Sequence, residues 1–196
     1  MEFDYPSGAT PLDPDEAAGL KLSHITNRAE LDRWELGNIL EAEEWAFRRR
    51  IPVDELLSVN FLLKLHKRML GNVWKWAGSF RNSEKNLGVP CWSIGPDLKH
   101  MLEDIKFWIV GNVYQPDEIS TRLHHRLVSI HLFANGNGRH ARLVSDLLLV
   151  HVLDRPRFTW GGRNLVQSGE CRESYINALR AADNRDYSLL LDFVRS

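Results

Sequence analysis

The stretch HLFANGNGRHAR, residues 131–142, interrupts the most hydrophobic part of the chain with a polar loop. Apolar residues at helical spacing precede the stretch, and the apolar run RHARLVSDLLLVHVLD, residues 139–154, follows its glycines. The sequence therefore predicts a loop between two helices. Gly136 and Gly138 permit positive φ angles and let a ligand approach main-chain N–H groups. Because the first turn of a helix has unpaired N–H groups and a partial positive charge, we expect an anion to bind at this loop.

Three side chains of the stretch are suited to act on a bound phosphate. Arg139 and Arg142 are three residues apart in the expected first turn, so their guanidinium groups share a face and can bind phosphate oxygens. His131, at the other end of the loop, belongs to a residue type with an ordinary pKa close to neutrality and can accept a proton from an attacking hydroxyl. Together these residues indicate phosphoryl or nucleotidyl transfer.

The composition limits the classes of protein to which the chain can belong. Its 196 residues are 43% hydrophobic, which suits one domain with a single core. The formal net charge of -1 provides no general basic field, so we expect neither nucleic acid nor a membrane as partner. Two cysteines are too few for a disulfide scaffold, and no apolar run is long enough to span a membrane. We therefore expect a cytoplasmic protein.

The apolar periodicity predicts an all-α fold. Residues 1–28 contain closely spaced prolines and glycines and are expected to form an extended leader, and residues 29–196 are expected to form a single helical domain. The segment 74–95 lacks a helical period and predicts turns with a short hairpin. Helices are predicted at about 29–50, 57–71, 98–111, 116–131, 138–154, 170–182 and 187–194.

The stretch 131–142 resembles the signature HxFx[D/E]GNGRxxR of the Fic family. Its matching residues are His131, Phe133, Gly136, Asn137, Gly138, Arg139 and Arg142. The segments 61–82 and 174–194 are also similar to Fic sequences, so the resemblance covers a core of about residues 55–195. With its TPLDPDE leader, the chain as a whole is similar to the small Fic proteins called mobile mystery protein B, which are found beside a helix-turn-helix partner.

The resemblance implies an all-helical enzyme that transfers AMP from ATP to a Ser, Thr or Tyr hydroxyl of a target protein. His131 would be the general base, and Asn137 would hold the α-phosphate together with the loop N–H groups. Arg139 would bind the β-phosphate and Arg142 the γ-phosphate. The implied nucleotide-binding residues are Gly136, Asn137, Gly138, Arg139 and Arg142.

The resemblance also implies a flap from Ser83 to Trp92 that aligns the target segment by strand addition. Main-chain hydrogen bonds make this mode of docking tolerant of sequence. The expected docking residues are Ser83, Glu84, Lys85, Asn86, Leu87, Gly88 and Val89.

Position 135 departs from the signature, because it is Asn where the family has Asp or Glu. The family residue is implied to hold the Mg²⁺ that bridges the phosphates. Mg²⁺ favours anionic oxygen, so we predict weaker metal binding at Asn135 and slower transfer, unless another carboxylate substitutes. A pseudoenzyme that only binds the nucleotide is therefore an alternative.

Fic enzymes are often inhibited by a helix glutamate that pairs with the second signature arginine, here Arg142. Residues Thr26 to Glu30 match the inhibitory pattern [S/T]xxxE[G/N] in part, and Glu35 is a second candidate because it lies two residues before Gly37. The alternative inhibitor is a separate antitoxin chain.

Two other classes of protein compete with the transferase. A helix-turn-helix module for DNA would span residues 123–145, but its second helix is too rich in leucine to be exposed. A zinc site would use His124, His125, His131 and His140, although no carboxylate or cysteine accompanies them at helical spacing.

Overall fold

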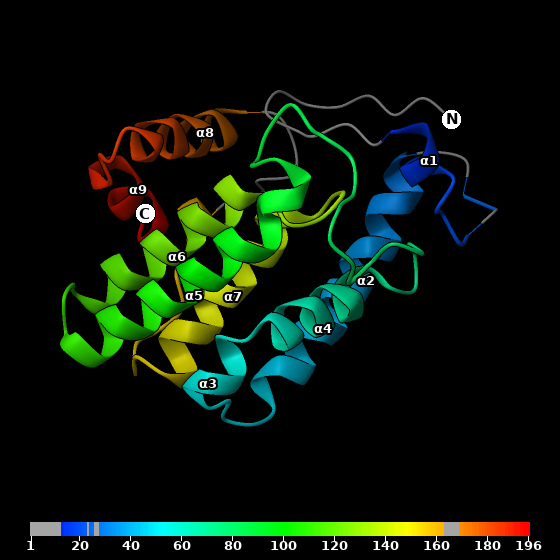
Figure 1. The fold of residues 1–196 in the computed structure, drawn as a ribbon. Coiled ribbons are helices and arrows are strands. Elements are labelled where there is room, and N and C mark those ends of the chain that lie inside the picture. Colours follow the sequence, from blue (N-terminus) through cyan, green and yellow to red (C-terminus); the bar gives the residue numbers. More distant parts are fainter. Residues whose placement is uncertain (1–12, 23, 26–27, 163–168) are drawn as a thin grey trace.

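The computed structural model describes residues 13–22, 24–25, 28–162 and 169–196, which form an all-α bundle as predicted (Figure 1). Within these residues the only β pairing is an isolated bridge between Leu20 and Trp74. None of the described helices combines the length and apolar composition needed to cross a membrane. The helices are α1 (Pro14–Ala17), α2 (Arg28–Phe47), α3 (Val53–Leu56), α4 (Val59–Leu70), α5 (Ile94–Gly111), α6 (Pro116–Ile130), α7 (Asn137–His151), α8 (Glu170–Asp183) and α9 (Ser188–Val194), with short 3₁₀ turns at Cys91–Ser93 and Trp160–Gly162.

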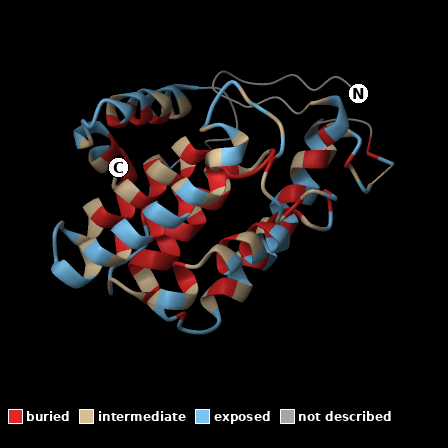
Figure 2. Ribbon diagram, viewed as in Figure 1, coloured by how far each residue is buried: buried red, intermediate tan, exposed pale blue. Residues whose placement is uncertain are grey.

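Helices α6 and α7 form the centre of the bundle and are joined by the polar loop. Helix α7 also packs against α2, α3 and α4, whereas α6 packs against α5, α8 and α9. As a result, α2 and α4 lie on one side of the central pair and α8 and α9 on the other (Figure 1). Leu143, Val144, Leu147 and Leu148 are all buried, which confirms the prediction that α7 is surrounded by other helices (Figure 2).

Helix α4 follows its sequence pattern closely. The Ser58 hydroxyl caps it by accepting a hydrogen bond from the main-chain N–H of Phe61 (3.2 Å), and Gly71 follows its last residue. Phe61, Leu65 and Met69 form the predicted buried stripe. This face packs on the rest of the core, and α2 runs alongside it.

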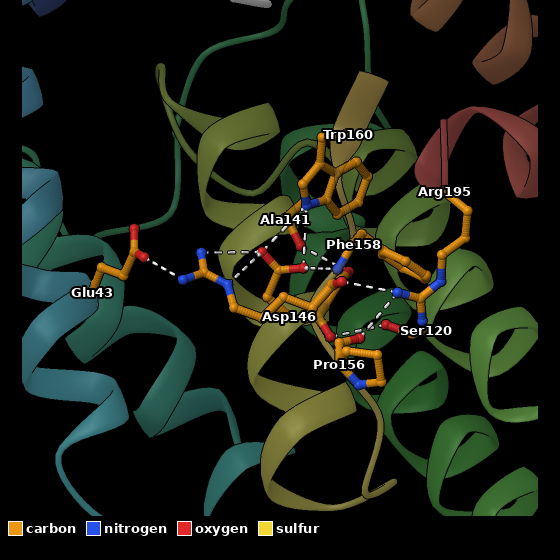
Figure 3. Close-up of polar contacts among 10 residues, drawn as sticks. Glu43, Ser120, Ala141, Asp146, Pro156, Phe158, Trp160 and Arg195 are labelled. Carbon is orange, nitrogen blue, oxygen red and sulfur yellow. Dashed lines mark hydrogen bonds and ion pairs between the residues drawn. The ribbon is translucent and has the colours of Figure 1, made fainter. Parts of the chain in front are cut away.

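The segment that follows α7 is fixed to this helix through Asp146 (Figure 3). Its carboxylate accepts hydrogen bonds from the Phe158 N–H (3.2 Å) and the Trp160 indole N–H (3.1 Å), and it pairs with Arg157 (3.4 Å). Burial raises the pKa of Asp146 despite these partners. Arg195, which follows α9, donates to the Pro156 carbonyl (3.1 Å) and so closes this end of the bundle.

Two local predictions are wrong. Residues 14–17, expected to be extended, form a helical turn, because Pro14 occupies its first position and Asp13 with Glu16 forms a capping box. Residues 83–90 form an irregular loop and not a hairpin. The Arg81 side chain binds the carbonyls of Ser83 and Val89, which a strand partner would otherwise occupy.

Candidate active site at the start of helix α7

The loop between α6 and α7 has left-handed backbone at both ends. His131 ends α6 with φ 58°, and its N–H donates to the Leu127 carbonyl (3.2 Å); Gly136 precedes α7 with φ 80°. The Asn137 side chain closes the loop, since its Nδ2 donates to the Phe133 carbonyl (2.8 Å) and its Oδ1 accepts from the Phe133 N–H (2.9 Å). Both polar atoms of this buried amide are thus used to shape the loop.

The first turn of α7 presents main-chain donors to one side of the loop. The N–H groups of Asn137, Gly138 and Arg139 have no acceptor among the described residues, whereas the His140 N–H binds the Gly136 carbonyl (2.9 Å). A Cβ placed on Gly138 would lie 3.8 Å from Arg142 Nη1, so this guanidinium lies beside the same turn. Unpaired N–H groups next to a guanidinium are suited to bind a phosphate.

His66 of α4 holds the loop from behind and was not singled out by the sequence analysis. Its ring is fully buried and stacks on the Phe133 ring, with centroids 3.6 Å apart and planes 7° from parallel. Its Nδ1 accepts from the Gly78 N–H (3.0 Å), so the hydrogen is on Nε2, which donates to the Asn135 carbonyl (3.0 Å). Burial lowers the pKa of His66 well below its ordinary value and keeps this neutral tautomer.

His131 lies inside the site as a neutral imidazole. Its residue is 6% exposed, and burial lowers its pKa to about 4, with the nearby charges of Arg81 and Lys85 acting in the same direction. Gly88 packs directly on it, because a Cβ at Gly88 would lie 2.6 Å from the His131 Cβ. The flap and the expected base are therefore in contact, and only glycine fits between them.

Arg81 fastens the flap to the signature loop and is a second residue that the sequence analysis missed. Its Nε donates to the His131 carbonyl (2.7 Å), its Nη1 to the Ser83 carbonyl (2.9 Å) and its Nη2 to the Val89 carbonyl. Its main-chain N–H donates to the Leu132 carbonyl (2.9 Å). One buried guanidinium thus fixes both ends of the flap to the loop that contains His131.

The leader holds the flap from the other side. The buried Lys85 ammonium pairs with Asp13 (2.8 Å) and with Glu16, and the Ser83 hydroxyl donates to Glu16 (2.9 Å). Among the expected docking residues, Glu84, Asn86, Leu87 and Gly88 are exposed, whereas Lys85 is tied to the leader.

Asn135 is arranged for hydrogen bonding and not for metal binding. Its Oδ1 accepts from the Gly136 N–H (2.7 Å) and lies 3.3 Å from Arg139 Nη2. An amide oxygen beside a guanidinium offers Mg²⁺ only a dipole, in a place where positive charge is already present. No cluster of three potential metal-ligating side chains exists within the described residues. These residues do not fit a bound Mg²⁺ as they stand.

Glu35 reaches the signature, as expected of an inhibitory glutamate, but it contacts a different arginine. Its Oε2 lies 2.6 Å from Arg139 Nη1, and its Oε1 accepts from the Trp74 indole N–H (2.6 Å). The expected pairing with Arg142 is therefore wrong for Glu35. Glu30, the other candidate, lies partly exposed in the first turn of α2, and Thr26 of its motif is outside the described residues.

The other histidines considered as zinc ligands have separate partners. His124 Nε2 lies 2.9 Å from the Tyr175 hydroxyl, His125 Nε2 lies 2.8 Å from Asp183, and His140 Nε2 lies 3.1 Å from the Leu62 carbonyl. Nor does α7 suit DNA recognition, because most of its length is buried.

Comparisons with known proteins find one family and several relatives that are similar to this chain. The model of the Fic/DOC family matches residues 56–149. The protein adenylyltransferase Fic of Nematostella vectensis is 23% identical over 174 residues, covering 87% of this chain and 39% of that protein. Its namesake from Aedes aegypti is 27% identical over 148 residues, covering 72% and 28%. The chain thus spans well under half the length of these curated relatives.

Solved Fic structures share the fold. Fic-1 (residues 134–508) from C. elegans has a TM-score of 0.63 at 22% identity. The match covers 91% of this chain and 51% of the Fic-1 chain. BepC from Bartonella tribocorum, solved with bound AMPPNP, has a TM-score of 0.67 at 14% identity. The match covers 93% of this chain and 97% of the BepC chain. Residues 56–149 match the Fic/DOC family, the signature lies within them, and the chain shares the fold of solved Fic structures.

Proposed function

We propose that this protein transfers AMP from ATP to a Ser, Thr or Tyr hydroxyl of a target protein. One observation carries the proposal: a neutral imidazole, His131, and the open first turn of α7 with Arg142 beside it lie at the two ends of one short loop. The names of the curated relatives, each a protein adenylyltransferase, support the same reaction.

In the proposed reaction the hydroxyl oxygen of the target attacks the α-phosphorus of ATP. The bond from that phosphorus to the oxygen bridging the α- and β-phosphates breaks, and pyrophosphate leaves. His131 takes the hydroxyl proton, because with a pKa of about 4 it is unprotonated at neutral pH. The N–H groups of the first turn of α7 and the Arg142 guanidinium stabilise the negative charge on the phosphates.

The phosphate roles of the other signature residues follow from their present partners. We assign the α-phosphate to the main-chain N–H groups around Gly138, since the Asn137 amide is used within the loop. We assign the β-phosphate to Arg139, which must first exchange its partner Glu35 for the nucleotide. Because Glu35 already lies on Arg139, inhibition within the chain needs no separate antitoxin.

The target segment is proposed to lie along the exposed part of the flap, beside Asn86, Leu87 and Gly88. Gly88 contacts His131 directly, so a hydroxyl presented at this point lies next to the base. The carbonyls of Ser83 and Val89 bind Arg81, which leaves the middle of the flap for the target.

A direct test is incubation of a cell lysate with ATP labelled at the α-phosphate, in the presence of Mg²⁺, with either the native protein or His131→Ala. We expect labelled protein bands that require His131. Equal labelling by both proteins would remove His131 from the mechanism.

Asn135 favours a second candidate function, in which the protein binds the nucleotide without transferring AMP. Its oxygen is engaged by Gly136 and Arg139, in the place where the family has a metal-binding acid. Saturable ATP binding without labelling of any protein, including this chain, would support this function over the transferase.

A further inference from the structure

The two signature arginines are held by different neighbours. Arg139 pairs with the Glu35 carboxylate on the α2 side of α7. Arg142 lies on the α8 side, with its Cζ 5.9 Å from the centroid of the Tyr175 ring. Asp146, one turn further along α7, pairs with Arg157. Arg142 thus lies beside a neutral side chain, and burial lowers its pKa from the ordinary value while Tyr175 and Asp146 oppose that shift.

The Tyr175 hydroxyl is fixed by a second histidine. Its oxygen lies 2.9 Å from His124 Nε2, and both residues are buried. A neutral imidazole has one bare nitrogen, and in the tautomer with the hydrogen on Nδ1 the Tyr175 hydroxyl donates to His124 Nε2 and offers its lone pairs to the guanidinium side. The imidazole is neutral, because burial, followed by the charge of Arg142, lowers the pKa of His124 to about 3. Helices α6 and α8 thus contribute the two hydrogen-bonded side chains beside Arg142 of α7.

The imidazole of His124 is itself held in place by the network around Asp146. The Trp160 ring packs on it, with centroids 4.6 Å apart, and the Trp160 indole N–H is bound by Asp146 (Figure 3). These contacts limit the positions that the Tyr175 hydroxyl can adopt. A fixed neighbour restricts a long arginine side chain before the ligand binds, so less conformational entropy is lost on binding.

The direction of this orientation is given by Gly138. A Cβ placed on that residue would lie 3.8 Å from Arg142 Nη1 and 3.9 Å from the Tyr175 hydroxyl oxygen, so both polar atoms face the first turn of α7. We propose that Tyr175, held by His124, is a positioning residue that aims Arg142 at the terminal phosphate of the bound nucleotide. The assignment rests on the proposed function, because it concerns recognition of ATP by the same site.

The test compares ATP and ADP affinities, measured by isothermal titration in the presence of Mg²⁺, for the native protein and Tyr175→Phe. This variant keeps the buried ring and loses only the hydroxyl. Because the guanidinium loses the fixed polar group that limits its orientation, we expect ATP affinity to fall about tenfold while ADP affinity stays unchanged. If Tyr175 had only a structural role, the substitution would lower the affinities for ATP and ADP by the same factor.

Tyr187→Phe is a matched control. The Tyr187 hydroxyl lies 3.1 Å from His125 Nδ1, and Arg122 lies over the Tyr187 ring with Cζ 4.1 Å from its centroid, so the same three residue types meet away from the signature. We expect this variant to keep the native ATP-to-ADP ratio. Should Tyr175→Phe fail to fold, His124→Phe should lower the ratio in the same direction.

The outcomes separate this inference from the proposed function. A native protein that binds neither nucleotide contradicts the proposed function itself. A native protein that binds ATP and ADP equally, or a Tyr175→Phe protein with the native ratio, overturns the role of Tyr175 and leaves nucleotide binding intact.

Discussion

Replacing Glu35 by Gln should release Arg139 and increase ATP affinity. The carboxylate of Glu35 is almost fully buried and lies 2.6 Å from Arg139 Nη1. Gln keeps the shape of the side chain and an oxygen that can accept from the Trp74 indole N–H, but it has no charge to hold the guanidinium. The substitution therefore removes the ion pair and spares the hydrogen bond to Trp74.

The size of the effect follows from the exposure of the pair. A hydrogen bond to a charged group contributes about 1.5–3 kcal/mol, and about 1.4 kcal/mol corresponds to a factor of ten in affinity. The Arg139 side chain is 21% exposed, so solvent screens part of this interaction. We therefore expect the lower end of the range, about a tenfold increase in ATP affinity for Glu35→Gln.

Isothermal titration with ATP measures the affinity, and labelling of the protein by itself with α-labelled ATP measures the accompanying activity. The control is Glu43→Gln on the same helix, eight residues later, because Glu43 also pairs with an arginine, Arg157, but away from the signature. If Glu35→Gln binds ATP as the native protein and Glu43→Gln do, the ion pair does not restrain Arg139. Internal inhibition by Glu35 would then be wrong.

Three further predictions concern the metal, the support of the loop and the pH. Asn135→Asp should support AMP transfer at lower Mg²⁺ concentrations than the native protein, because a carboxylate is a better ligand than an amide; identical titration curves would show that position 135 does not bind the metal. His66→Phe keeps the stacked ring but leaves two buried main-chain partners unpaired, so urea unfolding should show a loss of about 2–4 kcal/mol, and a loss below 1 kcal/mol would contradict its supporting role. His131 and His140 have folded pKa values of about 4 against an ordinary 6.5, so as the pH falls the unfolded chain takes up protons before the folded chain does. The free energy of unfolding should therefore fall from its value above pH 6.5 by roughly 3 kcal/mol per residue as the pH approaches 4. Urea midpoints that do not change between about pH 7 and pH 5 would refute this.

The sequence predicted the parts of the site that are close together in the chain. The loop from His131 to Gly136, the start of α7 and the buried course of that helix follow from glycine positions and apolar periodicity within a short stretch. Gly138 and Arg142 meet because they are four residues apart on a helix. Local spacing is sufficient to place such residues on one face.

Contacts across the fold could not be predicted in this way. Arg81 binds the carbonyl of His131, fifty positions away, and His66 binds that of Asn135, sixty-nine positions away. The only signal was that each is a polar residue in the segment 61–82, which already resembled the family. Nothing in that segment indicated which distant carbonyls would lie within reach.

The partner of Glu35 shows the same limit at a finer scale. Arg139 and Arg142 were expected to share a face, and three residues on an α-helix do leave them only about 60° apart. That angle is enough for α2 to approach one guanidinium and α8 the other. Which arginine a glutamate contacts depends on the position of its helix around α7, and apolar periodicity does not contain that information.

This division gives the two arginines different properties in the same site. Arg139 is held by a charged partner, Glu35, so its availability depends on whether that ion pair is broken. Arg142 lies beside the neutral Tyr175 side chain, so no ion pair with that neighbour has to be broken before the nucleotide binds. An anion entering at the first turn of α7 therefore meets Arg142 at once, and only its further phosphates compete with Glu35 for Arg139. Under the proposed function, control of the site acts through Arg139, and recognition of the triphosphate acts through Arg142.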